Sequence, residues 1–239
     1  VISPKRLFTN NWQDELWLVA GGIFGGSLYF FTENTALGIT QASNVSFIIC
    51  TAPLLTTILS LLFYKSEKAS KGLIYGSLLA LMGVGLIVFN GSFVLKISPI
   101  GDLLTLLAAL SWAFYSLIIK KMAGRYPAIF ITRKIFFYGV LTILPAFLLH
   151  PLHPDTAVLL QPAVLFNLLF LAVLASLICY VLWNVVLKQL GTVRASNYIY
   201  LNPLVTMIAS FLILDEKITL VALGGAACIV CGVYWAEKK

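Results

Sequence analysis

Eight apolar segments, each about as long as a membrane-spanning helix, dominate this sequence. A helix needs about 20 mostly apolar residues to cross the hydrocarbon core of a bilayer. The segments are too long for buried strands, and an open sheet cannot span lipid because its edge groups lack hydrogen-bond partners. We therefore predict an all-α integral membrane protein, with transmembrane helices over eight ranges. These are 16–36, 42–63, 72–90, 102–122, 128–149, 163–187, 195–214 and 218–236.

Composition supports the same class. Hydrophobic residues make up 60% of the chain and charged residues only 10%, whereas a soluble domain carries roughly 25% charged residues. So few charges cannot cover the surface of a water-soluble globule of 239 residues.

The basic residues predict an orientation. If residues 1–14 are cytoplasmic and the helices alternate, every Lys and Arg falls on the inner side except Lys96 and Lys217. This is the positive-inside pattern of membrane proteins, and it places both visible termini in the cytoplasm. Lipid head groups are then the expected partners of the net charge of +7, and no nucleic acid is needed. Arg133 and Lys134 lie just inside the fifth predicted helix and are expected to extend their long side chains to the inner surface.

The chain contains an internal repeat, centred on a proline in the middle of two apolar segments. Pro53-Leu54-Leu55-Thr56 resembles Pro203-Leu204-Val205-Thr206. The flanking matches are Leu37-Gly38 with Leu190-Gly191, Ala42-Ser43-Asn44 with Ala195-Ser196-Asn197, and Gly83-Val84 with Gly232-Val233. Predicted helices one to three thus match helices six to eight. Because the shift is an odd number of helices, the two copies should run in opposite directions, as in the inverted repeats of many secondary carriers.

The repeat also predicts the organisation of the chain. Residues 1–14 form an N-terminal segment, 15–91 a partial first copy of three helices, and 101–237 a complete second copy of five. The simplest interpretation is a ten-helix inverted-repeat bundle of which eight helices are visible and the first two are absent. An original eight-helix protein is the alternative, and it would require a lopsided duplication.

Several motifs of the second copy resemble the EamA repeat of the drug/metabolite transporter superfamily. They are Gly101-Asp102-Leu103-Leu104, the run Ala109-Leu110-Ser111-Trp112-Ala113-Phe114-Tyr115, Leu190-Gly191 followed by Ala195-Ser196, then Pro203, Glu216 and Gly232. The resemblance implies two inverted five-helix bundles around a central cavity, in a bacterial inner membrane. It also implies import or export of amino acids, other metabolites or drugs.

Polar and aromatic residues recur at helical spacing on five of the predicted helices. By the resemblance these helices line the cavity. The candidate substrate-binding residues are Tyr29, Glu33, Asn44, Thr51, Trp112, Tyr115, Tyr180, Trp183, Asn184, Tyr198 and Asn202. An asparagine in lipid needs a partner, so these faces should point inward. The alternative is that the amides join helices and that Trp and Tyr form interfacial belts.

Glu33 is the one acidic residue well inside a predicted helix, which makes it a candidate for substrate or proton binding. It also lies near the outer end of that helix, so interfacial or structural pairing is the alternative.

Pro53 and Pro203 each remove a backbone hydrogen bond. They predict either a structural kink or a hinge that shapes the cavity.

No cofactor or metal is expected. Cys228-x-x-Cys231 has the spacing of a zinc or redox motif but lies in an apolar segment, where packing is the simpler role. His150 and His153 lie in a predicted outer loop with no further ligand nearby. The GxxxG pairs, such as Gly21 with Gly25 and Gly72 with Gly76, predict close helix packing within the bundle or, alternatively, a homodimer contact.

We therefore predict a secondary carrier for small organic solutes that works by alternating access and is driven by protons or by the solute's own gradient. It is not expected to be an enzyme, because Glu33 has no evident catalytic partner. A channel-like facilitator, and a non-transporting scaffold or inactive fragment that needs a partner chain, are the alternatives.

Overall fold

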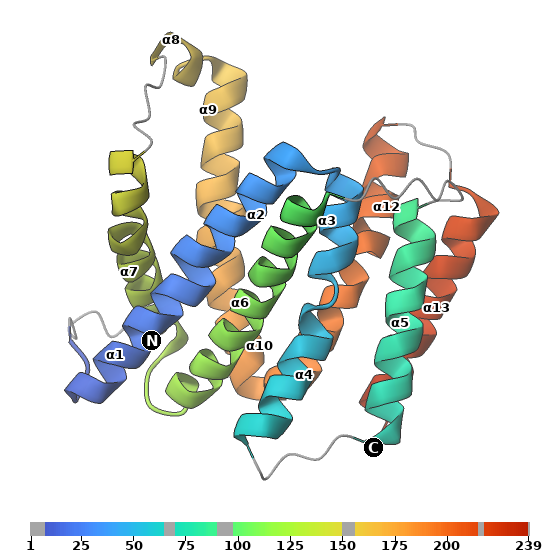
Figure 1. The fold of residues 1–239 in the computed structure, drawn as a ribbon, viewed down its shortest axis with the longest axis horizontal. Coiled ribbons are helices and arrows are strands. Elements are labelled where there is room, and N and C mark those ends of the chain that lie inside the picture. The colour runs from blue at the N-terminus through green and yellow to red at the C-terminus, as the bar shows by residue number, and fades with distance from the viewer. Residues whose placement is uncertain (1–7, 65–69, 90–97, 150–155, 215–217, 239) are drawn as a thin grey trace.

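The computed structural model describes residues 8–64, 70–89, 98–149, 156–214 and 218–238, and every regular element in these ranges is a helix. Figure 1 shows them as a bundle of long, roughly parallel or antiparallel helices. Seven of these helices are long and apolar enough to cross a membrane, in agreement with an all-α integral membrane protein. They are Asn44–Phe63, Lys71–Phe89, Pro99–Ala123, Ala128–Phe147, Pro162–Leu190, Thr192–Ile213 and Leu220–Glu237.

The first predicted span is helical but is not among these seven. It is one continuous helix made of α1 (Trp12–Gly22), η1 (Ile23–Ser27) and α2 (Leu28–Ile39). Within the predicted range 16–36, four glycines and Glu33 lower the mean hydropathy. The middle segment, η1, is a π-helix, a wider turn that hydropathy does not predict. A π-helix also interrupts the span that matches it in the second copy, where η2 (Phe170–Ile178) separates α9 (Pro162–Leu169) from α10 (Cys179–Leu190).

Both prolines of the internal repeat mark a break in a helix. The first break lies between α3 (Ala42–Ile49) and α4 (Ala52–Phe63), so that Pro53 is the second residue of the new helix. In the second copy, α11 (Thr192–Asn197) passes into a 3₁₀ turn, η3 (Tyr198–Leu201), before α12 (Asn202–Leu214). Pro203 is again the second residue of the new helix.

The last helix of each copy packs against the other along a line of glycines. These helices, α5 (Lys71–Phe89) and α13 (Leu220–Glu237), run antiparallel and lie side by side in Figure 1. Gly76 lies against Gly232, and Gly83 lies against Gly225. The repeat matches Gly83 with Gly232, and the same register matches Gly76 with Gly225. The two contacts are therefore equivalent, as expected across a two-fold axis between inverted copies.

The other long helices are α6 (Pro99–Ala123) and α7 (Ala128–Leu149), and α8 (Thr156–Leu159) is a short turn between α7 and α9. Helix α6 is the centre of the bundle, with 56% of its most apolar stretch buried, because α2, α3, α4 and α10 all pack on it. The span Pro162–Leu190 is the opposite case, with only 6% of that stretch buried within the described chain.

One end of the bundle collects the described basic residues, and we call it the basic end. Here α1, α5, α7 and α11 begin and α4, α6, α10 and α13 end. The residues are Lys71, Lys120, Lys121, Arg125, Arg133, Lys134, Lys188, Arg194 and Lys238. Several predictions concern residues outside the described ranges: the N-terminal segment through residue 7, Lys65, Lys68, Lys96, His150, His153, Glu216, Lys217 and Lys239.

Candidate functional site

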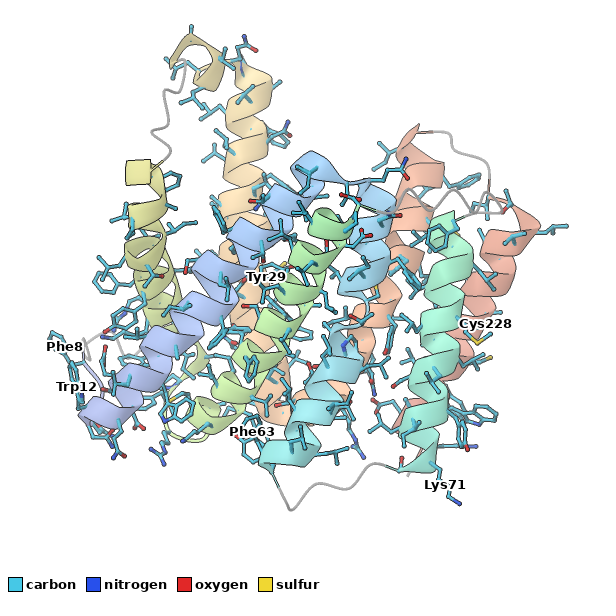
Figure 2. The ribbon with its side chains drawn as sticks, in the orientation of Figure 1. Phe8, Trp12, Tyr29, Phe63, Lys71 and Cys228 are labelled. Atoms are coloured by element: carbon cyan, nitrogen blue, oxygen red, sulfur yellow. The ribbon has the colours of Figure 1, made fainter. Side chains whose placement is uncertain are left out.

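Five of the predicted site residues form one aromatic cluster, which we define as Tyr29, Trp112, Tyr115, Tyr180 and Trp183. Trp112 is its centre. The ring centroid of Trp112 lies 5.1 Å from Tyr29 and from Tyr115, 5.7 Å from Tyr180 and 5.8 Å from Trp183. Tyr29 lies where α2 crosses α6 (Figure 2), so the cluster joins a helix of the first copy to α6 and α10 of the second.

A buried hydrogen-bond network supports one side of the cluster. The Tyr115 hydroxyl donates to Asn184 Oδ1 at 2.8 Å, and Asn184 Nδ2 donates to Thr132 Oγ1 at 2.9 Å. Asn184 is only 1% exposed, so both polar ends of its amide need these partners. The chain of bonds fixes the rotation of α6, α7 and α10 relative to one another.

Glu33 borders the other side of the cluster. The Tyr29 hydroxyl donates to Glu33 Oε1 at 2.9 Å, one helical turn away on α2. The carboxylate is half-buried, and it lies beside rings that can stack on a planar or cationic solute. The geometry thus places the one acidic residue of this span next to the aromatic surface.

The π-helix η1 supplies backbone acceptors to the cluster. The Tyr180 hydroxyl donates to the Gly25 carbonyl at 2.7 Å, and Ser111 Oγ donates to the Phe24 carbonyl at 2.8 Å. A π-turn shifts the backbone hydrogen bonds of a helix and is frequent at functional sites. Gly25 also lies directly against the Tyr115 ring, where a Cβ atom would overlap it.

The two tryptophans leave polar groups available. Trp112 Nε1 and Trp183 Nε1 are buried, and neither has a hydrogen-bond partner among the described residues. Buried donors are normally satisfied by protein, water or ligand. Two indole N–H groups could bind the acceptor groups of a small polar solute while the rings cover its apolar part.

Four predicted site residues lie elsewhere. Asn44 is buried on α3, and Thr51 is at the α3–α4 break, where its hydroxyl donates to the Ile48 carbonyl at 2.6 Å. Tyr198 and Asn202 are exposed at and after η3.

A second polar group of residues, at the basic end, joins α1 to α7 and to the turn between α6 and α7. Arg125 pairs with Asp14 at 2.6 Å, and the Tyr126 hydroxyl donates to the other Asp14 oxygen at 2.8 Å. Lys134 and Tyr138 both donate to Glu15 Oε1. The Lys134 side chain is buried and its ammonium pairs with Glu15 at the basic end, and its expected extension to the inner membrane surface stays a prediction.

The environment of Glu15 favours its charged form. Burial alone would raise the pKa of this carboxyl, but hydrogen bonds from Lys134, Tyr138 and Thr9 outweigh burial and lower the pKa to about 2. Glu15 lies at the basic end, outside the seven segments that are long and apolar enough to cross a membrane.

Sequence reasoning missed Thr132, Gly25 and the partners of Asp14 and Glu15. Thr132 lies beside Arg133 and Lys134 in a mostly apolar segment, and the acidic pair precedes the first span while its basic partners follow the fourth. The sequence contains these residues, but only the packing of the helices shows which of them form pairs.

Cys228 and Cys231 are free thiols on α13, where Cys228 is half-buried and Cys231 is exposed. No group of three metal-binding side chains occurs in the described ranges.

The comparisons with known proteins agree with this architecture. The model of the EamA-like transporter family matches residues 1–89 and 99–236. An uncharacterized transporter of Archaeoglobus fulgidus is 30% identical over 90% of this chain and 73% of its own length. A probable amino-acid metabolite efflux pump of Salmonella typhimurium is 29% identical over 72% of this chain and 60% of its own. A solved crystal structure aligns with 95% of this chain and with 77% of its own chain. The TM-score is 0.79 and the sequence identity 18%, so the two proteins share the fold.

Proposed function

The chain belongs to the EamA-like transporter family and is an integral membrane transporter, and on this basis we propose that it is a secondary carrier for small organic solutes. Amino acids and related metabolites are the first class to test, because two similar proteins are named as probable amino-acid metabolite efflux pumps. A bacterial inner membrane, with the basic end in the cytoplasm, is the proposed location. The ten-helix bundle remains a prediction.

The aromatic cluster is the observation that carries this proposal. It combines rings that can cover an apolar group with two indole N–H donors that have no partner in the described chain, and the Glu33 carboxylate borders it. A small solute with one polar end and one apolar end matches this combination. The cluster also joins helices from both copies, which is where carriers with inverted repeats bind their substrates.

Alternating access is the proposed mechanism, with the breaks at Pro53 and Pro203 as its hinges. Each break replaces a regular helical turn at the same place in each copy, so each half-helix can tilt without disturbing the other. Movement of one copy against the other would then expose the cluster to either side in turn. Counterflow of labelled solute in proteoliposomes tests this mechanism, because a channel-like pore gives passive flux without counterflow.

We further propose that Glu33 couples transport to protons, and a substitution tests this part separately. Glu33→Gln keeps the hydrogen bond from Tyr29 but removes the titrating group. The variant is expected to transport at a rate that no longer depends on pH between about 5 and 8, whereas the parent remains dependent. Tyr29→Phe, which keeps the carboxylate, is the matched control and should retain a pH-dependent rate. An unchanged pH profile in Glu33→Gln would exclude this role and leave the solute gradient as the energy source.

A further inference from the structure

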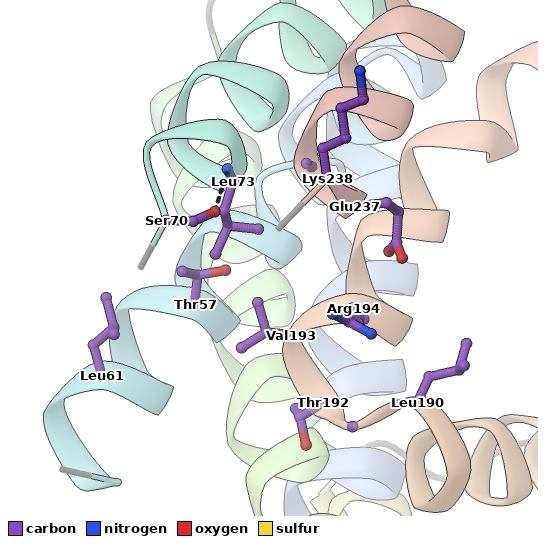
Figure 3. Close-up of a pocket in the computed structure, with 12 residues that line it drawn as sticks. Thr57, Leu61, Ser70, Leu73, Leu190, Thr192, Val193, Arg194, Glu237 and Lys238 are labelled. Atoms are coloured by element: carbon purple, nitrogen blue, oxygen red, sulfur yellow. Dashed lines mark hydrogen bonds between the residues drawn. The ribbon is translucent and has the colours of Figure 1, made fainter. Parts of the chain in front are cut away.

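A separate cavity of about 310 Å³ opens at the basic end, between the two copies. Figure 3 shows it between α4, the start of α5, the turn from α10 to α11 and the end of α13. We call it the basic-end pocket. Its walls include Thr57, Leu61, Leu73, Thr192, Arg194 and Glu237. None of these residues belongs to the aromatic cluster, and the volume is at the lower limit of ligand pockets, which are commonly about 300–1,000 Å³.

Opposite charges line this pocket, and no ion pair joins them in the described part of the chain. Arg194 is exposed on α11, and the Glu237 carboxylate points from α13 toward it (Figure 3). Glu237 Oε1 is buried and has no hydrogen-bond partner in the described chain. The other cation of the wall, Lys238, directs its ammonium to the Tyr234 ring, 5.2 Å from the centroid. The pocket therefore presents one guanidinium and one carboxylate to a ligand.

Buried polar groups continue from the pocket into the contact between α4 and α11. Thr192 and Asn197 are both 0% exposed, and neither the Thr192 hydroxyl nor the Asn197 amide has a partner among the described residues. The same holds for the hydroxyls of Thr56 and Ser196. In a membrane protein, buried polar groups without protein partners require water or a ligand. This contact between the copies is thus suited to a polar occupant.

The internal repeat indicates that the fold does not require these charges. In the register of the matching segments, Gln41 corresponds to Arg194 and Val88 to Glu237. The opposite end of the bundle thus has the same backbone plan without the charge pair. The positive-inside rule accounts for an arginine at the basic end but not for the glutamate beside it.

We infer that the basic-end pocket binds a small zwitterion, with its anionic group on Arg194 and its primary ammonium on Glu237. A guanidinium binds carboxylate or phosphate through two parallel hydrogen bonds, and a carboxylate accepts hydrogen bonds from an ammonium. Leu61 and Leu73 would cover a short apolar side chain. A free amino acid and the head group of an ethanolamine phospholipid share this chemistry. For a free amino acid the inference rests on the proposed function, because the pocket would then hold solute at the entrance to the carrier.

Equilibrium binding of labelled L-valine to the purified full chain in lipid-free detergent tests the inference. Isovalerate, which lacks the ammonium, and isobutylamine, which lacks the carboxylate, should compete poorly. Arg194→Gln and Glu237→Gln should each weaken binding by about tenfold or more, the usual effect of losing a hydrogen bond to a charged group. Lys121→Gln is the matched control, since its ammonium lies at the same end but 3.8 Å over the Trp17 ring, away from the pocket. Its affinity should be unchanged.

The source of the zwitterion follows from the same assay with lipid added. If phosphatidylethanolamine displaces valine from the parent and phosphatidylcholine does not, the head group occupies the site; if neither lipid competes, the ligand is the free amino acid. The inference is overturned if neither valine nor phosphatidylethanolamine binds, or if both pocket variants bind as the parent does. The assay needs no transport, so valine binding without counterflow would defeat the proposed function alone. Counterflow without any binding at this pocket would defeat the inference alone.

Discussion

At the scale of single residues, Gly25 is the position on which the aromatic cluster depends most directly. Its carbonyl accepts the Tyr180 hydroxyl, and its hydrogen atoms face the Tyr115 ring. Gly25→Ala should push Tyr115 away from Asn184 and lower the stability by about 1–3 kcal/mol, the usual cost of overpacking. Thermal unfolding in detergent measures the stability, and solute uptake should fall with it.

Gly38→Ala is the control for this substitution. It lies on the same span, near the end of α2, with no atom close to the position of an added Cβ. Stability and uptake should match those of the parent, or improve slightly because alanine favours a helix. Equal losses in the two variants would mean that the cluster does not depend on the space at Gly25.

Glu15 is the second residue whose surroundings make a definite prediction. Its pKa is lowered to about 2 from an ordinary value near 4.5. Its contribution to stability is therefore complete above pH 4.5 or so and is lost as the pH falls toward 2. Glu15→Gln leaves Lys134 buried without its partner and should destabilise the protein by about 3–5 kcal/mol at neutral pH.

Thermal unfolding between pH 5 and about 3 completes this test, in the window set by the two pKa values. The midpoint of the parent should fall through this window more steeply than that of Glu15→Gln, which lacks the titrating group. Lys134→Met combined with Glu15→Gln should recover much of the neutral-pH loss, because no unpaired charge remains buried. Parallel pH profiles for parent and single variant would contradict the lowered pKa.

At the scale of helices, the proline breaks are the elements most open to test. Pro53→Ala and Pro203→Ala each restore a backbone donor and should allow a continuous helix through the break. If the breaks are hinges, both variants should lose most of their transport rate with little change in solute affinity, and stability should not fall. Pro145→Ala is the control, because this proline lies within α7, a helix of the second copy that has no matching segment in the described first copy. The paired measurements are counterflow rate and equilibrium binding.

The helices were also the part of the structure that the sequence predicted most fully. Lipid demands that backbone groups be satisfied within a segment, so apolar length predicts helices with small errors at their ends. The repeat likewise predicted where α3–α4 and α11–α12 break. The π-helices η1 and η2 were not predicted, because a wider helical turn does not change the hydropathy of the sequence.

The candidate site was harder to predict from the sequence, for a related reason. A helix that is apolar all round carries little periodic signal, so its rotation in the bundle depends on contacts with other helices. Tyr115 and Asn184 are buried and hydrogen-bonded to each other, whereas Tyr198 and Asn202 are exposed, and composition did not distinguish the two pairs. Lys134 pairs with Glu15, which lies opposite it but far away in sequence, so sequence alone could not predict this contact.

At the scale of the whole molecule, the two-fold relation between the copies makes a prediction of its own. Gly83 and Gly232 occupy matching positions on α5 and α13, and each lies against the backbone of the partner helix. A Cβ atom at either would overlap that backbone, so Gly83→Ala and Gly232→Ala should separate the helices and destabilise the protein by about 1–3 kcal/mol each. Because the contacts are equivalent, the two losses should be similar.

The double variant and a control make this prediction specific to the symmetry. The two glycines lie in different contacts, against Gly225 and Gly76 respectively. Their effects should therefore add to within about 0.5 kcal/mol if the two contacts are independent. Gly224→Ala, on the same helix but with no atom near an added Cβ, should leave the unfolding temperature unchanged. A large loss at one matching glycine and none at the other would show that the α5–α13 contact is not shared equally between the copies. The inverted arrangement would then have no support from this contact.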